Sequence, residues 1–205
     1  MNDEMNHPPS QAEARAALAE VNQVLTQTRL TIAESISAPM LILWGCVWIA
    51  ADSLIQFVPS TVNYAWLVMD VVGFTGTWWI ANRRQTTLRR MPDWRVTFSW
   101  VAIFTFAILW MFLLLPWDLM TKNLPPAMNA LLGRKIAAYW HTIPMFAFIL
   151  GGLWLGRFFT WLGLIVTALI LIGYFFLPTY FLLWAGLAGG GALILSGVFI
   201  RKFWR

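Results

Sequence analysis

Residues 158–200 read FFTWLGLIVTALILIGYFFLPTYFLLWAGLAGGGALILSGVFI, and this run of 43 residues contains no Asp, Glu, Lys or Arg. A transmembrane helix needs about 20 apolar residues, so the run has about twice the length of one crossing. Pro178 and Thr179 interrupt the run near its middle, where a proline disfavours a continuous helix. The stretch therefore predicts two membrane-spanning helices joined by a tight reversal.

The chain as a whole is also strongly hydrophobic. Of its 205 residues, 60% are hydrophobic and only 11% are charged, and the mean hydropathy is +0.67. A soluble domain of this length cannot bury so much apolar surface. Windows of about 20 residues with few charges give six spans, at about 38–58, 62–81, 96–115, 136–156, 158–177 and 179–200. We therefore expect an all-α, polytopic membrane protein with six transmembrane helices and a cytoplasmic amphipathic helix at its N-terminus.

The positions of the charges predict the orientation of the chain. Fourteen Lys and Arg residues against nine acids give a formal net charge of +5, and the bases lie at the ends of apolar runs. Because they form no single basic stripe, we expect no nucleic-acid partner. With the N-terminus inside, eleven bases are cytoplasmic and three, Lys122, Arg134 and Lys135, are outside. Both termini, including the basic tail 201–205, are therefore expected in the cytoplasm, and a bacterial inner membrane is the simplest location.

The loop between the second and third expected spans is rich in arginine. Its bases are Arg83, Arg84, Arg89, Arg90 and Arg95. Arginines beside a membrane can bind anionic lipid headgroups or a phosphorylated ligand, and they are also ordinary determinants of topology. A role in topology is the simpler interpretation of this loop, and lipid or phosphate binding is the functional alternative.

Residues 1–37 are expected to form a separate cytoplasmic segment. Ser10 and Glu13 have the spacing of a capping box, which predicts a helix over about 11–36. Apolar positions recur along this helix at alternating steps of four and three, namely Ala14, Leu18, Val21, Leu25, Thr28 and Ile32. Such a seam indicates contact with a second copy of the chain or with a cytosolic protein partner. A helix folded back onto the protein's own loops is the simpler alternative.

Three ionisable side chains, Asp52, Asp70 and His141, fall inside expected spans, where each costs about 3 kcal/mol at the membrane centre. At a rise of about 1.5 Å per residue, Asp52 and His141 lie at one depth, and Asp70 lies deeper. Polar and aromatic residues share the helical faces of these carboxylates: Trp48 and Gln56 in the first span, and Asn63 and Trp66 in the second. The pattern predicts that these residues lie close together in the outer half of the bundle.

This cluster has two interpretations. As a site, it is a polar pocket open to the outer side, in which two carboxylates and an imidazole bind a proton, a cation or a small cationic ligand. Trp48 and Trp66 would then offer aromatic faces to the cation. As a structural feature, it is a closed hydrogen-bond network that holds helices together. Pro144 is expected to open or kink the fourth span beside His141.

Two pairs of glycines have the spacing that lets membrane helices approach closely. Gly152 and Gly156 are four residues apart in the fourth span, and Gly186 and Gly190 are four apart in the sixth. Packing within one chain is the simpler interpretation of these pairs. A dimer face or a flexible gating helix is the functional alternative.

Signatures of common enzymes are missing from the sequence, which has no Gly-x-Ser-x-Gly, His-Glu-x-x-His, Gly-Lys-Ser/Thr or Cys-x-x-Cys motif. Cys46 is the single cysteine, and His7 and His141 are the only histidines. We therefore expect no metal site, no cofactor and no enzymatic activity. The sequence favours a sensor or accessory protein that binds a ligand or partner through the bundle and the N-terminal helix. The alternative is a small proton- or cation-coupled transporter or channel that uses Asp52, Asp70 and His141.

Overall fold

The computed structural model describes residues 10–32, 37–85, 94–114 and 124–203, and every regular element within these ranges is a helix. The long helices are α1 (Gln11–Ile32), α2 (Ala38–Phe57), α3 (Val62–Gln85), α4 (Trp94–Leu114), α6 (Pro126–Leu155), α7 (Arg157–Phe176) and α9 (Gly191–Phe203). The shorter segments are η2 (Pro59–Thr61), η3 (Pro178–Tyr180), α8 (Phe181–Trp184) and the π-helical η4 (Ala185–Gly190). The protein is therefore all-α, as its composition predicts.

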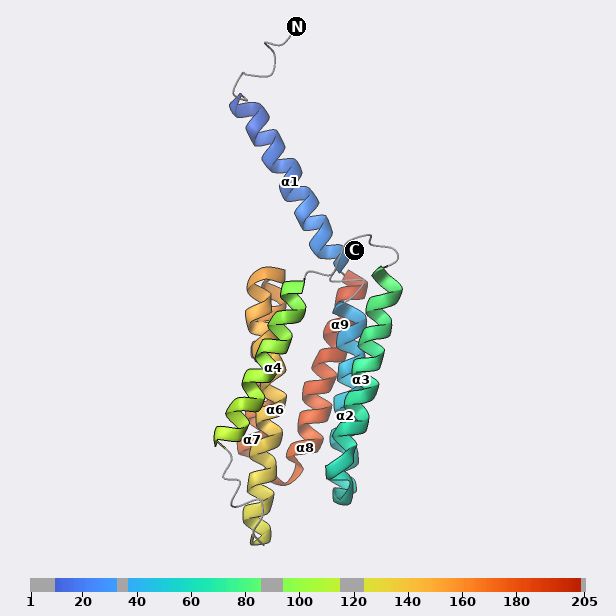
Figure 1. Ribbon diagram of the computed structural model, residues 1–205, viewed down its shortest axis with the longest axis vertical. Coiled ribbons are helices and arrows are strands. Elements are labelled where there is room, and N and C mark those ends of the chain that lie inside the picture. Colours follow the sequence, from blue (N-terminus) through green and yellow to red (C-terminus); the bar gives the residue numbers. More distant parts are fainter. Residues whose placement is uncertain (1–9, 33–36, 86–93, 115–123, 204–205) are drawn as a thin grey trace.

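Four helical stretches are long and apolar enough to cross a membrane, namely Ala38–Phe57, Pro126–Leu153, Arg157–Phe176 and Pro178–Phe203. α3 packs against α2, and α4 packs against α6. Both run along the length of the bundle (Figure 1). The predicted reversal at Pro178 is confirmed, because η3 separates α7 from the last helical stretch. These helices support a multi-pass membrane protein.

The helix that contains the fourth expected span begins ten residues before that span. α6 begins at Pro126, so residues 126–135, which the hydropathy pattern leaves in an outer loop, are helical. A proline in the first helical turn loses no hydrogen bond, and bases such as Arg134 and Lys135 lower hydropathy without lowering helix propensity. With 30 residues, α6 is about 45 Å long and exceeds the hydrocarbon thickness of about 30 Å. Its first turns extend past the other helices at the end of the bundle opposite α1 (Figure 1).

The bundle consists of two groups of helices. In the first group, α2 packs against α3 and also against η4 and α9; in the second group, α6 packs against α7 and α4. α7 also contacts η4 and α9, and so joins the groups. α2 and the last helix meet at glycines, since a Cβ added to Gly45 would lie 2.5 Å from the carbonyl oxygen of Gly190. The first and last apolar helices therefore touch backbone to backbone.

α6 and α7 form a hairpin that turns at Gly156. The φ angle of Gly156 is 131°, in a region that residues with side chains rarely adopt. α6 ends at Leu155 and α7 begins at Arg157, between the fourth and fifth expected spans. Beside the turn, Gly152 lies against the backbone and side chain of Thr160. The glycines of this pair thus lie within one hairpin, where they allow the turn and the close contact.

α6 continues as a helix through Pro144.

α1 begins at Gln11 with both hydrogen bonds of a capping box. The Ser10 N–H donates to the Glu13 carboxylate (2.8 Å), and the Glu13 N–H donates to Ser10 Oγ (3.3 Å). Every side chain from Gln11 to Val24 is exposed. The helix projects away from the bundle, at the end where α9 ends (Figure 1). This part of α1 therefore does not fold back onto the described helices.

Acidification is expected to fray the first turn of α1. Hydrogen bonds with Ser10 hold the pKa of Glu13 below its ordinary value of 4.5. The bond from the Ser10 N–H has the larger effect, and the bond with the Ser10 hydroxyl has the smaller one. Because the folded-state pKa is depressed, the cap contributes fully above the unfolded pKa and is lost as pH falls through the folded pKa. The Ser10 amide resonance of the micelle-embedded protein should therefore shift with a midpoint below 4.5. Glu13→Gln should abolish this transition, and a midpoint above 4.5 would contradict the capping geometry.

Candidate functional site

Asp52 of α2 and His141 of α6 are hydrogen-bonded to each other inside the bundle. The distance between Asp52 Oδ2 and His141 Nε2 is 2.8 Å, and the side chains are 0% and 2% exposed. Because α2 and α6 belong to different helix groups, this contact links the two groups directly. The common depth that the sequence predicts for the two residues agrees with their contact.

The hydrogen bonds of His141 determine how many protons the pair holds. His141 Nδ1 lies 2.7 Å from the carbonyl oxygen of Ala137. A carbonyl only accepts, so Nδ1 carries a hydrogen. The contact between Nε2 and Asp52 Oδ2 then holds one proton, either on the imidazole beside a carboxylate or on the carboxyl beside a neutral imidazole. Both arrangements are neutral overall, which suits a site removed from water.

Two tryptophans enclose the imidazole of His141. The ring centroids of Trp48 and Trp66 lie 4.6 Å and 5.6 Å from that of the imidazole, both in edge-to-face geometry. Trp48 is buried and Trp66 is half-buried. The open pocket that the sequence suggests is therefore not formed around Asp52 and His141, because their side chains are enclosed. Their geometry is that of a closed contact between helices.

One oxygen atom of this cluster has no hydrogen-bond partner among the described residues. Asp52 Oδ1 is buried and accepts no hydrogen bond from a described residue. Buried polar atoms are almost always paired, and ordered water commonly serves those that protein groups leave unpaired. The Asp52 carboxyl therefore keeps one acceptor for a proton or a water molecule.

η4 reaches the Asp52–His141 pair because its glycines have no side chains. A Cβ added to Gly186 would lie 3.0 Å from Asp52 Cβ and 3.2 Å from the carbonyl oxygen of Trp48. Gly189 lies against the Trp48 ring in the same way. π-helical turns are rare and occur often at functional sites. The last apolar stretch thus packs a π-helical turn onto Asp52.

Asp70 lies on a face of α3 whose other residues, before and after Asp70 in the sequence, contact neighbouring helices. Trp66 touches the imidazole, Gly73 lies against the Trp44 ring, and Thr77 Oγ1 accepts a hydrogen bond from the Trp44 indole (3.0 Å). Asp70 itself is half-buried and makes no hydrogen bond or ion pair with a described residue. The structure therefore does not join Asp70 to the Asp52–His141 pair.

Gln56 and Asn63 also stand apart from the pair. The Gln56 side-chain amide donates to the carbonyl oxygen of Thr179 (3.1 Å), beside the reversal at Pro178. The Asn63 side chain lies outside the described residues. The predicted cluster is therefore divided: Asp52, His141, Trp48 and Trp66 come together, and Gln56 connects α2 to η3 instead.

The arginine-rich loop is described only at its start. The guanidinium carbon of Arg83 lies 4.0 Å from the ring centroid of Trp79. The side chains of Arg84 and Arg95, and all of Arg89 and Arg90, lie outside the described residues. Lipid or phosphate binding by this loop stays a prediction.

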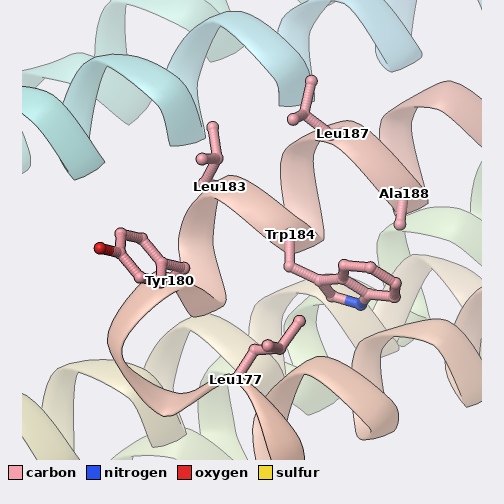
Figure 2. A pocket seen from close by; sticks show the side chains of 6 residues that line it. All are labelled: Leu177, Tyr180, Leu183, Trp184, Leu187 and Ala188. Carbon is pink, nitrogen blue, oxygen red and sulfur yellow. The ribbon is translucent and has the colours of Figure 1, made fainter.

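An apolar groove of about 380 Å³ lies beside the reversal between α7 and α8 (Figure 2). It is lined by Leu177, Tyr180, Leu183, Trp184, Leu187 and Ala188. The Trp184 indole donates its N–H to the carbonyl oxygen of Leu169 (2.7 Å), and its ring lies where Gly173 has no side chain. Since the indole is already paired, the groove offers apolar contact and suits a hydrocarbon chain better than an ion.

The hydropathy pattern misses a contact between Arg134 and Tyr174. The guanidinium carbon of Arg134 lies 5.0 Å from the ring centroid of Tyr174. Arg134 Nε is buried and has no hydrogen-bond partner among the described residues. One sequence signal exists: Arg134 precedes His141 by seven residues, which places both on one face of a helix.

In the part of the chain that the structure describes, no three His, Cys, Asp or Glu side chains gather as metal ligands. No protein-family model, curated protein or solved structure matches the chain. Its function is therefore inferred from its own residues and their contacts.

Proposed function

We propose that the protein is a non-enzymatic, six-span membrane protein of the sensor or accessory class, which binds a helical protein partner through α1. α3 has 24 residues and α4 has 21, enough for two crossings in addition to the four long apolar stretches. The excess of bases on one side of this arrangement supports cytoplasmic termini and a cell-membrane location.

The exposed apolar seam of α1 carries this proposal. Leu18 and Val21 are 63% and 54% exposed, on a helix that projects from the bundle (Figure 1). The apolar residues of the seam recur at alternating steps of four and three, which is the spacing of contact residues in paired helices. Such residues are buried when two helices pair. α1 contains two acids and two bases, so it lacks the basic face that an anionic lipid surface attracts. A protein helix therefore fits this surface better than a membrane does.

The Asp52–His141 pair gives the bundle a contact that can change. Because it links α2 to α6, a proton or ligand that separated the pair would weaken the connection between the helix groups. α2 carries Asp52 and follows α1 closely in the sequence. A change in the Asp52–His141 contact would therefore reach α1, the partner-binding helix, through α2.

Photo-crosslinking distinguishes the seam from the rest of α1. A photoreactive amino acid at Val21 is expected to give one discrete product in intact membranes, whereas the same group at Ala16, on the opposite face, should give little. Both positions are exposed, so access is matched. Leu18→Glu should remove the Val21 product, because a charge in the seam opposes helix pairing.

The mass of the crosslinked product identifies the partner. A product of twice the 23.4 kDa chain indicates a second copy, and another single mass indicates a different protein. Equal products from Val21 and Ala16, or no product from Val21, would contradict partner binding through the seam.

A second candidate function is proton- or cation-coupled transport. The Asp52–His141 pair holds one proton at its contact, and Asp70 is a half-buried carboxylate with no partner among the described residues. Proton flux into proteoliposomes that is lost in Asp52→Asn and Asp70→Asn but kept in Cys46→Ser would favour this function over the first. A wild-type protein without flux of protons or monovalent cations would argue against it.

A further inference from the structure

Two buried polar atoms lack partners among the described residues, Asp52 Oδ1 and Arg134 Nε. Asp52 belongs to the pair between the helix groups. Arg134 lies in the first turns of α6, at the end of the bundle opposite α1 (Figure 1). This second atom has no part in the function proposed above.

The Arg134 side chain lies against an aromatic ring, and its donors have no partner among the described residues. Its guanidinium carbon lies 5.0 Å from the ring centroid of Tyr174 in α7. Arg134 is half-buried and makes no hydrogen bond or ion pair with a described residue. An arginine has five N–H donors in a planar fork that matches the oxygens of a phosphate or carboxylate. A guanidinium fixed in this way is ready to bind an oxyanion.

The depth of Arg134 indicates where the oxyanion comes from. Twenty-one residues separate Arg134 from Leu155, where α6 ends near Arg157. At about 1.5 Å per residue this distance is about 32 Å, slightly more than the hydrocarbon thickness of about 30 Å. Arg134 therefore lies at the level of the lipid headgroups when the other end of α6 lies at the opposite membrane surface.

We infer that Arg134 and the ring of Tyr174 form a binding site for a phosphate oxyanion, supplied by an anionic phospholipid of the membrane. The ring holds the guanidinium by a cation–π contact, and the N–H groups donate to the phosphate oxygens. Bound lipid would give Arg134 the acceptors that the described residues do not provide.

The chain itself contains one competitor for Arg134. Asp118 is the only acid after Asp93 in the sequence, and it lies in segment 115–123, outside the described residues. An ion pair between Arg134 and Asp118 would satisfy the guanidinium without lipid. The experiment therefore includes Asp118→Asn.

Native mass spectrometry of the full-length protein, delipidated in detergent and titrated with phosphatidylglycerol, tests the site. Arg134→Gln is expected to weaken lipid binding at least about tenfold, as the loss of charge-assisted hydrogen bonds predicts. Lys135→Gln removes the same charge from the next residue and should leave the affinity unchanged. Tyr174→Phe should bind like the wild type, because the ring remains, and Tyr174→Leu should bind more weakly. The two Tyr174 variants keep the test valid if Arg134→Gln does not fold.

Three outcomes would overturn the inference. Equal losses in Arg134→Gln and Lys135→Gln would show a general effect of surface charge. Tighter lipid binding in Asp118→Asn would show that Asp118 occupies Arg134 in the native protein. Displacement of the lipid by millimolar inorganic phosphate, with Arg134-dependent phosphate binding in lipid-free protein, would assign the oxyanion site to a soluble anion instead.

Discussion

Replacement of Asp52 with alanine is expected to lower the free energy of unfolding by about 3–5 kcal/mol, the usual effect of removing one member of a buried pair. The substitution leaves His141 Nε2 without the partner that lies 2.8 Å away. Both side chains are enclosed, so bulk water cannot replace the lost hydrogen bond. Unfolding in mixed micelles with increasing SDS, followed by tryptophan fluorescence, measures the difference.

Asp52→Asn is the matched control for this substitution. The asparagine amide has nearly the same shape and can donate to His141 Nε2 while Nδ1 still donates to Ala137, so the loss should stay below about 1.5 kcal/mol. The double variant Asp52→Leu/His141→Leu removes both polar groups and should unfold close to the wild type. Equal losses in Asp52→Ala and Asp52→Asn would show that the hydrogen bond contributes nothing to stability.

Gly45→Ala is expected to destabilise the protein by about 3 kcal/mol or more, at the upper end of the range for overpacked sites. The added methyl would lie 2.5 Å from the carbonyl oxygen of Gly190 and 3.1 Å from the backbone nitrogen of Ile194. Two of the opposing atoms are backbone atoms, so α2 and the last helix must move apart. The same unfolding experiment measures this effect.

Gly191→Ala provides the control, because a Cβ at Gly191 meets nothing within 4 Å. In a helix, alanine is more favourable than glycine by about 1 kcal/mol, so this variant should be as stable as the wild type or more stable. The two substitutions add the same methyl group with opposite expected signs. A Gly45→Ala protein as stable as Gly191→Ala would disprove the close contact of the two helices.

The contact between Asp52 and His141 follows from the sequence because helix geometry is regular. A fixed rise and period give each residue a depth and a face, and the two residues share a depth in spans that cross the same membrane. The same regularity gathers Trp48 and Trp66 around the imidazole. It cannot show which neighbouring helix each face meets, and so Gln56 pairs with Thr179 and leaves the predicted cluster.

Other features depend on energies that hydropathy does not measure. The first turns of α6 carry Arg134 and Lys135, which resist transfer into lipid but form helices readily, so a helix that leaves the membrane resembles a loop. The glycines of η4 predict close packing, but the π-helical turn depends on contact with α2 in the folded bundle. The ring contact of Arg134 depends in turn on where α6 begins.

The contact between the first and last apolar helices sets an order of events during synthesis. Gly45 and Gly190 are 145 residues apart in the chain. At about 5–20 residues per second, the ribosome needs on the order of ten seconds to supply the second after the first. During this interval the face of α2 that carries Gly45 lacks its partner helix, and Asp52 is synthesised 89 residues before His141. The nascent chain therefore exposes the Gly45 face of α2 until the last apolar helix has been synthesised.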